Sequence, residues 1–474
     1  MNSLLLIGAD WVQTDQVVTI ASPFDGRIVG EVSLGDATHL RLAVAAAHAA
    51  FENITRRQAP FERAAILARV AALIEQLRPE FVRLIVAEAG KPVTLAEAEV
   101  TRAVGTFQLA AELARATPGH LLDLDAFAPG RGHVGLVRRF PLGVIYGLTP
   151  FNFPLNLVAH KVAPALATGN TLVVKPSPQT PLTALLLGRL ALEAGAPPGQ
   201  LNVVTCANAD AAAPLADERV KMVSFTGSAA VGWKLKALCG SKKITLELGG
   251  NAGAIVHEDA ALDLAVPALA AGAFAYAGQS CISTQRIFVH APVYDAFRDR
   301  FVAHVRAHLR TGDPRDPAVT VGPMINAAAL ARIRGTLEAA RAVGATVLLG
   351  GTVEGPCLTP TVVEMPHQRC TLCAEEAFAP VVTLHRYGSF TDALVELNAS
   401  RYGLQAGVFT QDIGRIHQAF ETLDVGAVLI NQAPTFRVDG QPYGGVKDSG
   451  FGREGVASAM AEMTEPRSLI LRVA

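Results

Sequence analysis

The fold is indicated most directly by residues 143–175, which read GVIYGLTPFNFPLNLVAHKVAPALATGNTLVVK. This segment begins with a short β-rich run at 143–148 and continues as a helical pattern from Pro154 to Thr168 that Gly169 ends. A second β-rich run follows at 171–175. A strand, a helix and another strand in this order predict two parallel strands joined by a crossover helix.

The same alternation continues downstream of this segment. We expect a helix at 181–194 and strands at 202–205 and 221–225, and then a second series that begins with a strand at 252–256. The second series continues with helices near 293–309 and 327–343 and with strands near 381–384 and 407–410. This rhythm predicts an α/β fold built on parallel strands.

Two stretches depart from the alternation. From 37 to about 115 the apolar spacing is helical, and Pro60 suits the first turn of one helix, so several helices precede the first strong strand. From 117 to 139 the periodicity lapses, and Pro129-Gly130-Arg131-Gly132 indicates a loop or an exposed hairpin. We expect this excursion to be suited to an interface.

The last residues form a further departure. Residues 465–472, EPRSLILR, alternate after a proline in the manner of a single β-strand. A lone strand needs a partner sheet, in this chain or in another subunit. The pattern therefore points to a homo-oligomer.

Composition describes a large and nearly neutral chain. Its 474 residues are 50% hydrophobic and 18% charged, which suits two or three packed domains. The formal net charge is −1 with scattered Lys and Arg, so we expect no nucleic-acid partner. The start lacks a basic leader, and the longest apolar run, 264–278, falls short of the ~20 residues that span a bilayer. We expect a cytoplasmic protein without a membrane partner, in which 264–278 is a buried helix leading to Cys281.

The six cysteines are few for this length and fit a reducing compartment. Cys370 and Cys373 form a Cys-x-x-Cys pair, but a zinc site there would need two further ligands. The histidines show no paired-ligand pattern. We expect a structural role for the cysteine pair and no metal.

Three side chains have the types that acyl transfer needs. Cys281 stands in GQSCIS, Glu247 in LELGG and Asn152 in PFNFP. A thiol adds to a carbonyl carbon, an amide N–H holds the resulting oxyanion, and a carboxylate activates water against a thioester. The set predicts a cysteine-nucleophile enzyme that needs no metal.

These three motifs and four others resemble the NAD(P)-dependent aldehyde dehydrogenase superfamily. The others are VKPS at 174–177, FTGS at 225–228, EEAFAPV at 375–381 and PYGGVKDSG at 442–450, and together they run nearly the full chain in order. The resemblance implies a Rossmann-like cofactor domain, an α/β catalytic domain that carries Cys281, and a β oligomerisation arm.

The resemblance also implies domain boundaries. Residues 1–119 and 139–248 are expected to form the cofactor-binding domain, and residues 249–445 the catalytic domain. Residues 120–138 and 446–474 are expected to form a bridging element that makes a homodimer or homotetramer.

By this resemblance Cys281 is the nucleophile, rather than a buried inert thiol. Asn152 and the backbone N–H of Cys281 hold the oxyanion, unless Asn152 is a plain turn residue. Glu247 takes a proton from water to hydrolyse the thioester, unless it caps strand-end amides. Lys161 and Glu454 are expected to assist proton movement. We limit them to supporting roles, because Lys and Glu on helices usually face solvent.

The expected cofactor is NAD(P)⁺. Gly227, Ser228 and Gly232 follow a β-rich run and open a helix, which places backbone donors near a pyrophosphate. Glu376 and Phe378 resemble the pair that positions the nicotinamide ribose and ring. Without the resemblance, they would be a surface charge and a core aromatic.

Lys175, followed by Ser177 and Pro178, resembles the lysine that contacts the adenosine ribose. Relatives that prefer NAD often have a glutamate at the position of Pro178. A carboxylate there would repel a 2′-phosphate, so Pro178 leaves both NAD and NADP open.

The expected substrate is a small polar or anionic aldehyde. The segment 434–439, PTFRVD, resembles the branch that contains lactaldehyde, phosphonoacetaldehyde and glyceraldehyde phosphate dehydrogenases, and Arg437 suits an anionic tail. Phe153 and Ser280 stand where a phosphonate-binding site would be expected to have histidine and arginine. We therefore expect a hydroxy- or monoanionic aldehyde, with Phe153 beside it.

The expected reaction is oxidation of the aldehyde to a free acid through a thiohemiacetal and a thioester on Cys281. One alternative is a coenzyme A-acylating semialdehyde dehydrogenase, although such relatives generally lack a glutamate at the position of Glu247. Another is a catalytically inactive relative that serves as a binding or structural element. The intact Cys281, Glu247 and Asn152 disfavour it.

Overall fold

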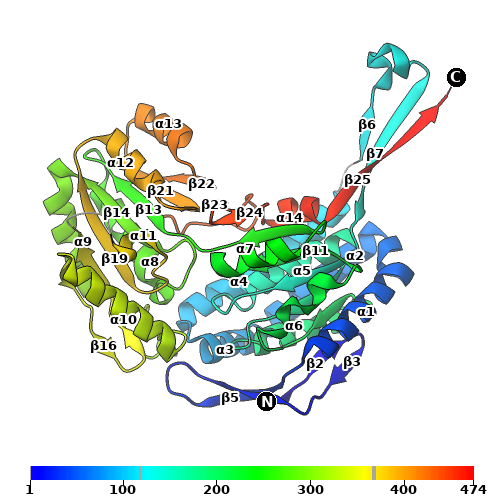
Figure 1. Ribbon diagram of the computed structural model, residues 1–474, viewed down its shortest axis with the longest axis horizontal. Helices are drawn as coiled ribbons and strands as arrows, with labels where there is room; N and C mark the ends of the chain where they lie inside the picture. Colours follow the sequence, from blue (N-terminus) through cyan, green and yellow to red (C-terminus); the bar gives the residue numbers. More distant parts are fainter. Residues whose placement is uncertain (1, 117–118, 366–369, 474) are drawn as a thin grey trace.

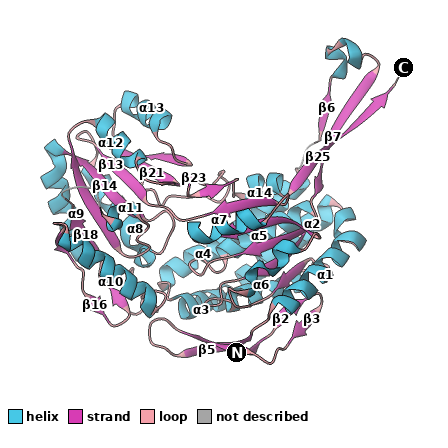
Figure 2. Ribbon diagram, in the orientation of Figure 1, coloured by secondary structure: helices cyan, strands magenta, loops and turns pink. Residues whose placement is uncertain are grey.

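The computed structural model describes residues 2–116, 119–365 and 370–473. Figure 1 shows two lobes and an arm that projects away from one of them and carries the C-terminus. The first lobe contains an eight-stranded sheet and the second lobe a seven-stranded sheet, and most neighbouring strands in both are parallel (Figure 2). The predicted α/β fold is confirmed.

The first-lobe sheet has a parallel centre and antiparallel edges. Its central strands are buried along their whole length, because helices cover both faces. In order across the sheet the strands are β24 (Gly450–Phe451), β12 (Lys243–Glu247), β11 (Val220–Thr226), β8 (Val144–Leu148), β9 (Thr171–Lys175), β10 (Leu201–Val203), β2 (Leu5–Ile7) and β3 (Asp10–Val12).

Two layers of helices enclose this sheet, as in a doubly wound fold. One face carries α2 (Pro60–Gln76), α3 (Arg78–Ala89), α4 (Val93–Arg115), α5 (Asn156–Thr168) and α6 (Leu182–Glu193), and the other carries α1 (Ala37–Asn53) and α7 (Ala229–Leu238). The helical stretch predicted from 37 to 115 is confirmed as α1 to α4. Gly169 ends α5 with a φ of 82°, a left-handed conformation that glycine adopts without strain.

The second-lobe sheet is also covered on both faces. In order its strands are β15 (Thr346–Leu349), β18 (Thr361–Glu364), β19 (Val381–Tyr387), β14 (Thr284–His290), β13 (Ala252–Val256), β21 (Gln405–Phe409) and β22 (Ala427–Ile430). One face packs against α8 (Leu262–Phe274), α9 (Tyr294–His308), α10 (Ala327–Ala342) and α11 (Thr371–Ala374), and the other against α12 (Phe390–Asn398) and α13 (Ile413–Thr422).

The arm is a three-stranded antiparallel sheet of β6 (His120–Leu122), β7 (His133–Pro141) and β25 (Thr464–Arg472). The expected hairpin excursion is therefore present, and its residues 117–118 lie outside the described residues. The terminal strand finds its partner within this chain, because β25 pairs with β7 from Thr464 opposite Pro141 to Arg472 opposite His133.

The chain crosses back to the first lobe before it forms the arm. β24 pairs with β12 in the first-lobe sheet, and α14 (Val456–Glu462) contributes Val456 and Met460 to the core between the sheet and its helices. The last residues of the chain therefore belong partly to the first lobe and partly to the arm.

Short strands were missed at the start of the chain and inside the second lobe. Before the first helix lie β1 (Asn2–Ser3), β2, β3, β4 (Val17–Ala21) and β5 (Ile28–Ser33), which were not predicted, although α1 to α4 do precede the predicted strand β8. Two small pairs, β16 (Val353–Glu354) with β17 (Cys357–Leu358) and β20 (Tyr402–Gly403) with β23 (Val446–Lys447), complete the strands. Among the described residues, no helix has the length and apolar character needed to cross a membrane.

Candidate active site

The candidate site lies between facing edges of the two sheets. In the first lobe the carboxyl ends of β9, β8, β11 and β12 lie along one edge, because these strands are parallel. In the second lobe the segments that precede β14 and β19 lie toward it. Between them is a cavity of ≈ 310 Å³. Its lining includes Arg102, Asn152, Phe153, Gly227, Ser228, Glu247, Ser280, Cys281, Glu376, Phe378, Arg437 and Tyr443.

A strained turn brings Cys281 to this cavity. The prediction of one buried helix over 264–278 was wrong in its last part, because α8 ends at Phe274. Tyr276 and Ala277 then adopt left-handed backbone conformations, each with a φ of 53°, ahead of Gly278 at 62°. For a residue with a Cβ such a conformation costs about 1–3 kcal/mol, and residues held in it cluster at functional sites.

Cys281 is partly buried, and among the described residues its thiol shares a hydrogen bond with the hydroxyl of Tyr443 at 3.1 Å. Burial raises the pKa of the thiol to about 12, although the hydrogen bond with Tyr443 and the charge of Arg437 act in the opposite direction. The thiol is therefore protonated at neutral pH, and a reaction through its sulfur needs a group that removes the proton.

Asn152 lies beside the cysteine turn. Its side chain is 4% exposed, and its Nδ2 donates to the backbone oxygen of Gln279 at 3.0 Å. This bond holds the amide two residues from Cys281 and uses one of its two N–H groups. The structure thus brings a side-chain N–H donor and the cysteine to the same cavity.

Glu247 ends β12 and is 5% exposed. Within the described residues, neither of its carboxylate oxygens has a hydrogen-bond partner. Burial and the neighbouring Glu454 raise the pKa of Glu247 well above its ordinary value. Burial thus favours the neutral form of Glu247, and only its ionised form, with both oxygens open to the cavity, can act as a base.

Lys161 and Glu454 are buried, so the expectation that they face solvent was wrong. Lys161 lies on α5, 1% exposed, and its Nζ donates to the hydroxyls of Ser224 at 3.1 Å and Thr226 at 2.8 Å. Glu454 is 5% exposed and precedes α14. Both line a second cavity of ≈ 10 Å³ that Glu247 also borders, a space of about one water molecule.

Arg437 sits at the centre of a buried charge network. It pairs with Glu454 at 3.3 Å and lies 3.9 Å from Asp439, while its guanidinium stacks 3.6 Å from the ring centre of Tyr443. Burial disfavours its charge, but these carboxylates raise the pKa of Arg437 above its usual range. Asp439 also binds Arg102, at 2.6 Å.

The predicted pyrophosphate-binding residues lie where β11 meets α7. Gly227 and Ser228 line the cavity, and no side chain of the described residues caps the start of α7, where the Val231 amide already donates to the Ser228 backbone oxygen and the earlier amides are left for a ligand. Gly232 lies one turn into α7, where a Cβ would come within 2.4 Å of Leu248. Gly232 therefore allows close packing of α7, and the open helix end fits a dinucleotide phosphate.

Glu376 and Phe378 line the opposite wall. Glu376 accepts a hydrogen bond from the backbone N–H of Gly250 at 3.0 Å, and burial raises the pKa of this carboxyl to about 7. Phe378 has a φ of 45° and meets Phe151 edge to face at 5.9 Å. A carboxylate and an aromatic ring beside Cys281 fit a ribose and a planar ring.

Lys175, Ser177 and Pro178 lie outside this lining but at the same sheet edge. Lys175 is the last residue of β9, 4% exposed, and its Nζ donates to Asn208 at 2.7 Å. Burial lowers the pKa of Lys175. Ser177 accepts from the N–H of Gln179 at 3.2 Å, which fixes the turn that carries Pro178.

Phe153 and Ser280 complete the lining near the thiol. Phe153 meets Tyr276 edge to face at 6.4 Å, and the ammonium of Lys91 lies 3.6 Å from its ring centre. Because the Lys91 ammonium lies over one face of the Phe153 ring, the contact fixes the position of the ring. The ring presents an apolar edge to the cavity.

Tyr443 lines the cavity and was quoted within a motif, but it was not predicted as a site residue. Tyr443 contacts both the Cys281 sulfur and the Arg437 guanidinium. Its position in the Pro442-Tyr443-Gly444-Gly445 motif was the available signal. Cys370 and Cys373 are free thiols with their sulfurs 3.5 Å apart, and their structural role stays a prediction.

Comparisons with known proteins agree with this geometry. A model of the aldehyde dehydrogenase family matches residues 11–469. Over 459 residues the chain is 40% identical to aspartate-semialdehyde dehydrogenase 1 of Pseudomonas canavaninivorans, covering 96% of this chain and 97% of that protein.

Solved structures are similar over the whole length. Aldehyde dehydrogenase 21 of Physcomitrella patens, in complex with its reaction product succinate, superposes with a TM-score of 0.97 at 38% identity, covering 100% of this chain and 98% of that one. The NADP-dependent glyceraldehyde-3-phosphate dehydrogenase of Bacillus halodurans, complexed with NADP, has a TM-score of 0.97 at 33% identity, covering 100% of both chains.

Proposed function

The chain belongs to the aldehyde dehydrogenase family and is an NAD(P)-dependent aldehyde dehydrogenase, and we propose that it oxidises a small polar or monoanionic aldehyde through a thioester on Cys281. One observation carries the proposal: Cys281, Asn152 and Glu247 come from three separate segments and line a single cavity. That cavity also reaches the open end of α7, where a dinucleotide phosphate fits.

In the first step the sulfur of Cys281 bonds to the aldehyde carbon, and the carbonyl π electrons move to oxygen. The thiol proton has to leave, because burial raises the pKa of the thiol to about 12, and it passes to solvent water. The free N–H of Asn152 donates to the oxyanion, a contact worth about 10²–10³ in rate at comparable sites. When bound, the nicotinamide supplies the acceptor for the hydride that leaves this carbon.

In the second step the thioester is hydrolysed. The ionised form of Glu247 takes a proton from water, the water oxygen bonds to the acyl carbon, and the Cys281 sulfur leaves as the thiolate. The proton then has a route through the small cavity that Glu247 shares with Lys161 and Glu454. These supporting residues are buried and charged, which suits proton movement.

A monoanionic substrate is supported by the charges at the cavity wall. Arg102 and Arg437 both line it, but Asp439 and Glu454 pair with them. The wall is thus polar with little excess positive charge, which favours one negative charge over two. Phe153 adds an apolar edge.

An aldehyde panel tests this substrate class. We expect semialdehydes with one carboxylate to exceed both propanal and glyceraldehyde 3-phosphate in kcat/KM. Arg437→Gln should raise the KM for the monoanion about tenfold, the value of one charge-assisted hydrogen bond, and leave that for propanal unchanged. Equal loss for both substrates would assign Arg437 a structural role.

Both NAD and NADP are proposed as cofactors, since Pro178 offers no carboxylate beside Lys175. A glutamate there would repel a 2′-phosphate. Pro178→Glu is therefore expected to raise the KM for NADP more than that for NAD, measured as NAD(P)H absorbance at fixed aldehyde. A variant that changes both equally would contradict this reading.

We also propose that the chain forms a homodimer or homotetramer through the arm. A cytoplasmic location is proposed as well, because six free thiols suit a reducing compartment. Leu121, Leu469 and Ile470 on the arm are at least half exposed, and β25 is an edge strand. Light scattering of the full chain and of an Ile470→Lys variant tests this, since the charge should reduce the oligomer mass.

The decisive experiment for the reaction itself is Cys281→Ser. We expect loss of nearly all NAD(P)H formation, with cofactor binding retained, and no such loss for the buried thiol variant Cys239→Ser. Product analysis separates the alternatives: a free acid supports hydrolysis by Glu247, whereas product formed only with coenzyme A would support the acylating reading. Absence of turnover with every aldehyde would support the alternative of a catalytically inactive relative that serves as a binding or structural element.

A further inference from the structure

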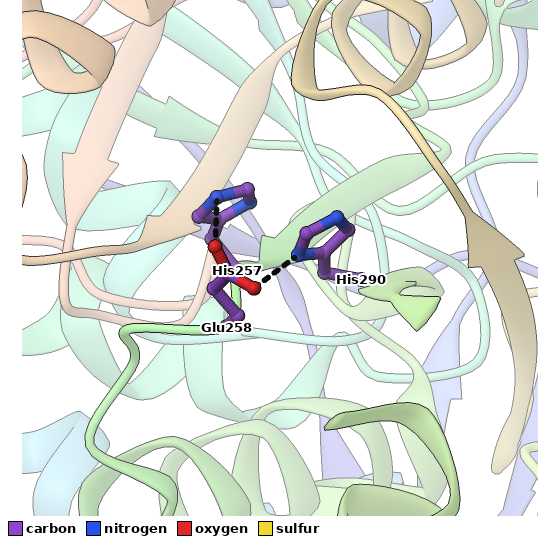
Figure 3. A group of neighbouring side chains, drawn as sticks. All are labelled: His257, Glu258 and His290. Atoms are coloured by element: carbon purple, nitrogen blue, oxygen red, sulfur yellow. Dashed lines mark ion pairs between the residues drawn. The ribbon is translucent and has the colours of Figure 1, made fainter. Parts of the chain in front are cut away.

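The carboxyl edge of the second-lobe sheet lies at the opposite end of its strands from Cys281. β14 runs from Thr284 to His290, so its ends lie about 20 Å apart at about 3.3 Å per residue. His257 follows β13 and His290 ends β14, and these two strands are neighbours. The sheet therefore brings His257, Glu258 and His290 together (Figure 3). The cluster lies at the end of β14 that is opposite to the catalytic cavity.

Three electron-pair donors converge in this cluster. Figure 3 shows the Glu258 carboxylate between the two rings, with its oxygens toward them. Nε2 of His257 lies 3.9 Å from one oxygen, and Nδ1 of His290 lies 3.5 Å from the other. Both ring nitrogens are buried and, within the described residues, have no hydrogen-bond partner. Buried nitrogens without a partner are costly unless a ligand uses them.

The other nitrogen of each ring is already held by an oxygen. Nδ1 of His257 lies 2.7 Å from the hydroxyl of Tyr387, and Nε2 of His290 lies 3.1 Å from the backbone oxygen of Gly388. Because a carbonyl only accepts, His290 carries its proton on Nε2 and its lone pair on Nδ1, toward Glu258. Such second contacts orient histidines that bind metals.

We propose that His257, Glu258 and His290 form a zinc site separate from the catalytic cavity. Two imidazoles and one carboxylate are an established zinc donor set, and tetrahedral geometry at a Zn–N distance of about 2.1 Å puts ligand atoms about 3.4 Å apart. The three ligand atoms lie within 4.8 Å of one another, and the shortest carboxylate-to-ring separations are 3.5 Å and 3.9 Å, one to each Glu258 oxygen, so a small contraction gives this value. The two rings are stacked, with centroids 4.4 Å apart and planes 10° from parallel, so small side-chain rotations have to turn the two nitrogens toward one ion.

The surroundings suit a cation with one open position. The Glu258 side chain is 48% exposed, so water reaches the fourth position. The nearby guanidinium of Arg415 is compensated, since it pairs with Asp412 at 3.3 Å and with Asp259 at 3.7 Å. The bound ion ties the end of β13 to the end of β14, and it stabilises the fold because the unfolded chain lacks the assembled site.

Zinc binding by the chelator-stripped full chain tests the proposal. We expect one zinc ion per chain by elemental analysis after dialysis against Zn²⁺, and a rise in melting temperature with Zn²⁺ concentration. X-ray absorption should give only nitrogen and oxygen ligands at about 2.0–2.2 Å. Glu258→Gln and His290→Gln should weaken zinc binding at least about tenfold, while circular dichroism shows that they remain folded.

Two controls separate this site from other zinc ligands of the chain. His304 and His308 form another histidine pair, with ring centroids 4.4 Å apart on α9, so His304→Gln is the matched variant and should keep the zinc. Cys370→Ser with Cys373→Ser should also keep it. The proposal is overturned if the stripped chain takes up no zinc, if Glu258→Gln binds it as tightly as the parent, or if sulfur appears at about 2.3 Å.

Discussion

Two regions of this chain contain buried carboxylates that differ in how many hydrogen bonds their oxygens accept. Under the first-lobe sheet, Glu88 accepts from the N–H groups of Leu182 and Thr183 at the start of α6. Glu99 there accepts from two N–H groups at the start of α5 and from the ammonium of Lys91. At the active-site cavity, Glu247 is equally buried but has no hydrogen-bond partner among the described residues.

This difference distinguishes buried carboxylates that have a structural role from buried carboxylates that take part in a reaction. A buried carboxylate with filled acceptor sites caps a helix and fixes its position. A buried carboxylate with empty acceptor sites destabilises the fold and is retained where a reaction needs its oxygens. We therefore expect substitutions in the two regions to separate activity from stability.

The largest effect is expected from Glu247→Gln on turnover. The amide cannot take the proton from water, so steady-state kcat should fall by about 10²–10⁴-fold. The first turnover should survive, giving one NAD(P)H per active site and an acyl adduct on Cys281 by intact mass spectrometry. The melting temperature should stay near that of the parent, since no hydrogen bond of Glu247 is lost.

Glu99→Gln is the structural counterpart. The variant leaves Lys91 without its charged partner in a buried site, at a cost of about 3–5 kcal/mol in the free energy of unfolding. Urea denaturation measures this loss. Lys91→Met in the Glu99→Gln background should restore much of it, because the unpaired charge is removed; failure to restore it would mean that the carboxylate acts mainly through α5.

The fold could be predicted from the sequence wherever the spacing of apolar residues was regular over a long segment. Helices α1 to α4 and the strand-helix-strand unit around α5 have such patterns, and Gly169 marks the end of α5. The strands of residues 2–33 have only two to six residues each, and β4 alternates in burial although its sequence, VVTIA, does not alternate in polarity. The pairing of β25 with β7 joins residues far apart in sequence, and no local pattern records it.

The residue types of the candidate site could be predicted from the sequence, but the burial and the partners of these residues could not. The motifs supplied Cys281, Asn152 and Glu247, and the structure brings all three to one cavity. Their roles stay predictions. The burial of Lys161 and Glu454 was missed, because a charge on an otherwise apolar stretch is usually exposed and only tertiary packing determines its partners. For the same reason the sequence could not distinguish the saturated Glu99 from the open Glu247.

A smaller effect is expected from Glu88→Gln, in the pH dependence of stability. Burial raises the pKa of Glu88 to about 7, although three hydrogen-bond donors act in the opposite direction. Between pH 4.5 and about 7 the unfolded chain releases this proton while the folded chain keeps it, so the free energy of unfolding falls as the pH rises. The glutamine should flatten this fall by up to about 1.4 kcal/mol per pH unit, measured by urea titrations.

The smallest effect concerns Glu376, which is intermediate between the two regions. It accepts one hydrogen bond from Gly250 and faces the cavity, and burial raises its pKa to about 7. If its carboxylate holds the nicotinamide ribose, the KM for the cofactor should fall as the pH rises from 6 to 8 and the group ionises. Glu376→Gln should remove this dependence and raise the cofactor KM about tenfold at pH 8.

The neighbouring Glu375 is the matched control for this prediction. It is half-exposed and pairs with Arg401 at 3.3 Å and with the hydroxyl of Tyr402 at 3.2 Å, outside the cavity lining. Glu375→Gln should leave the pH profile of the cofactor KM intact. If both variants shift the profile alike, the loop as a whole determines affinity, and Glu376 belongs with the structural carboxylates rather than with Glu247.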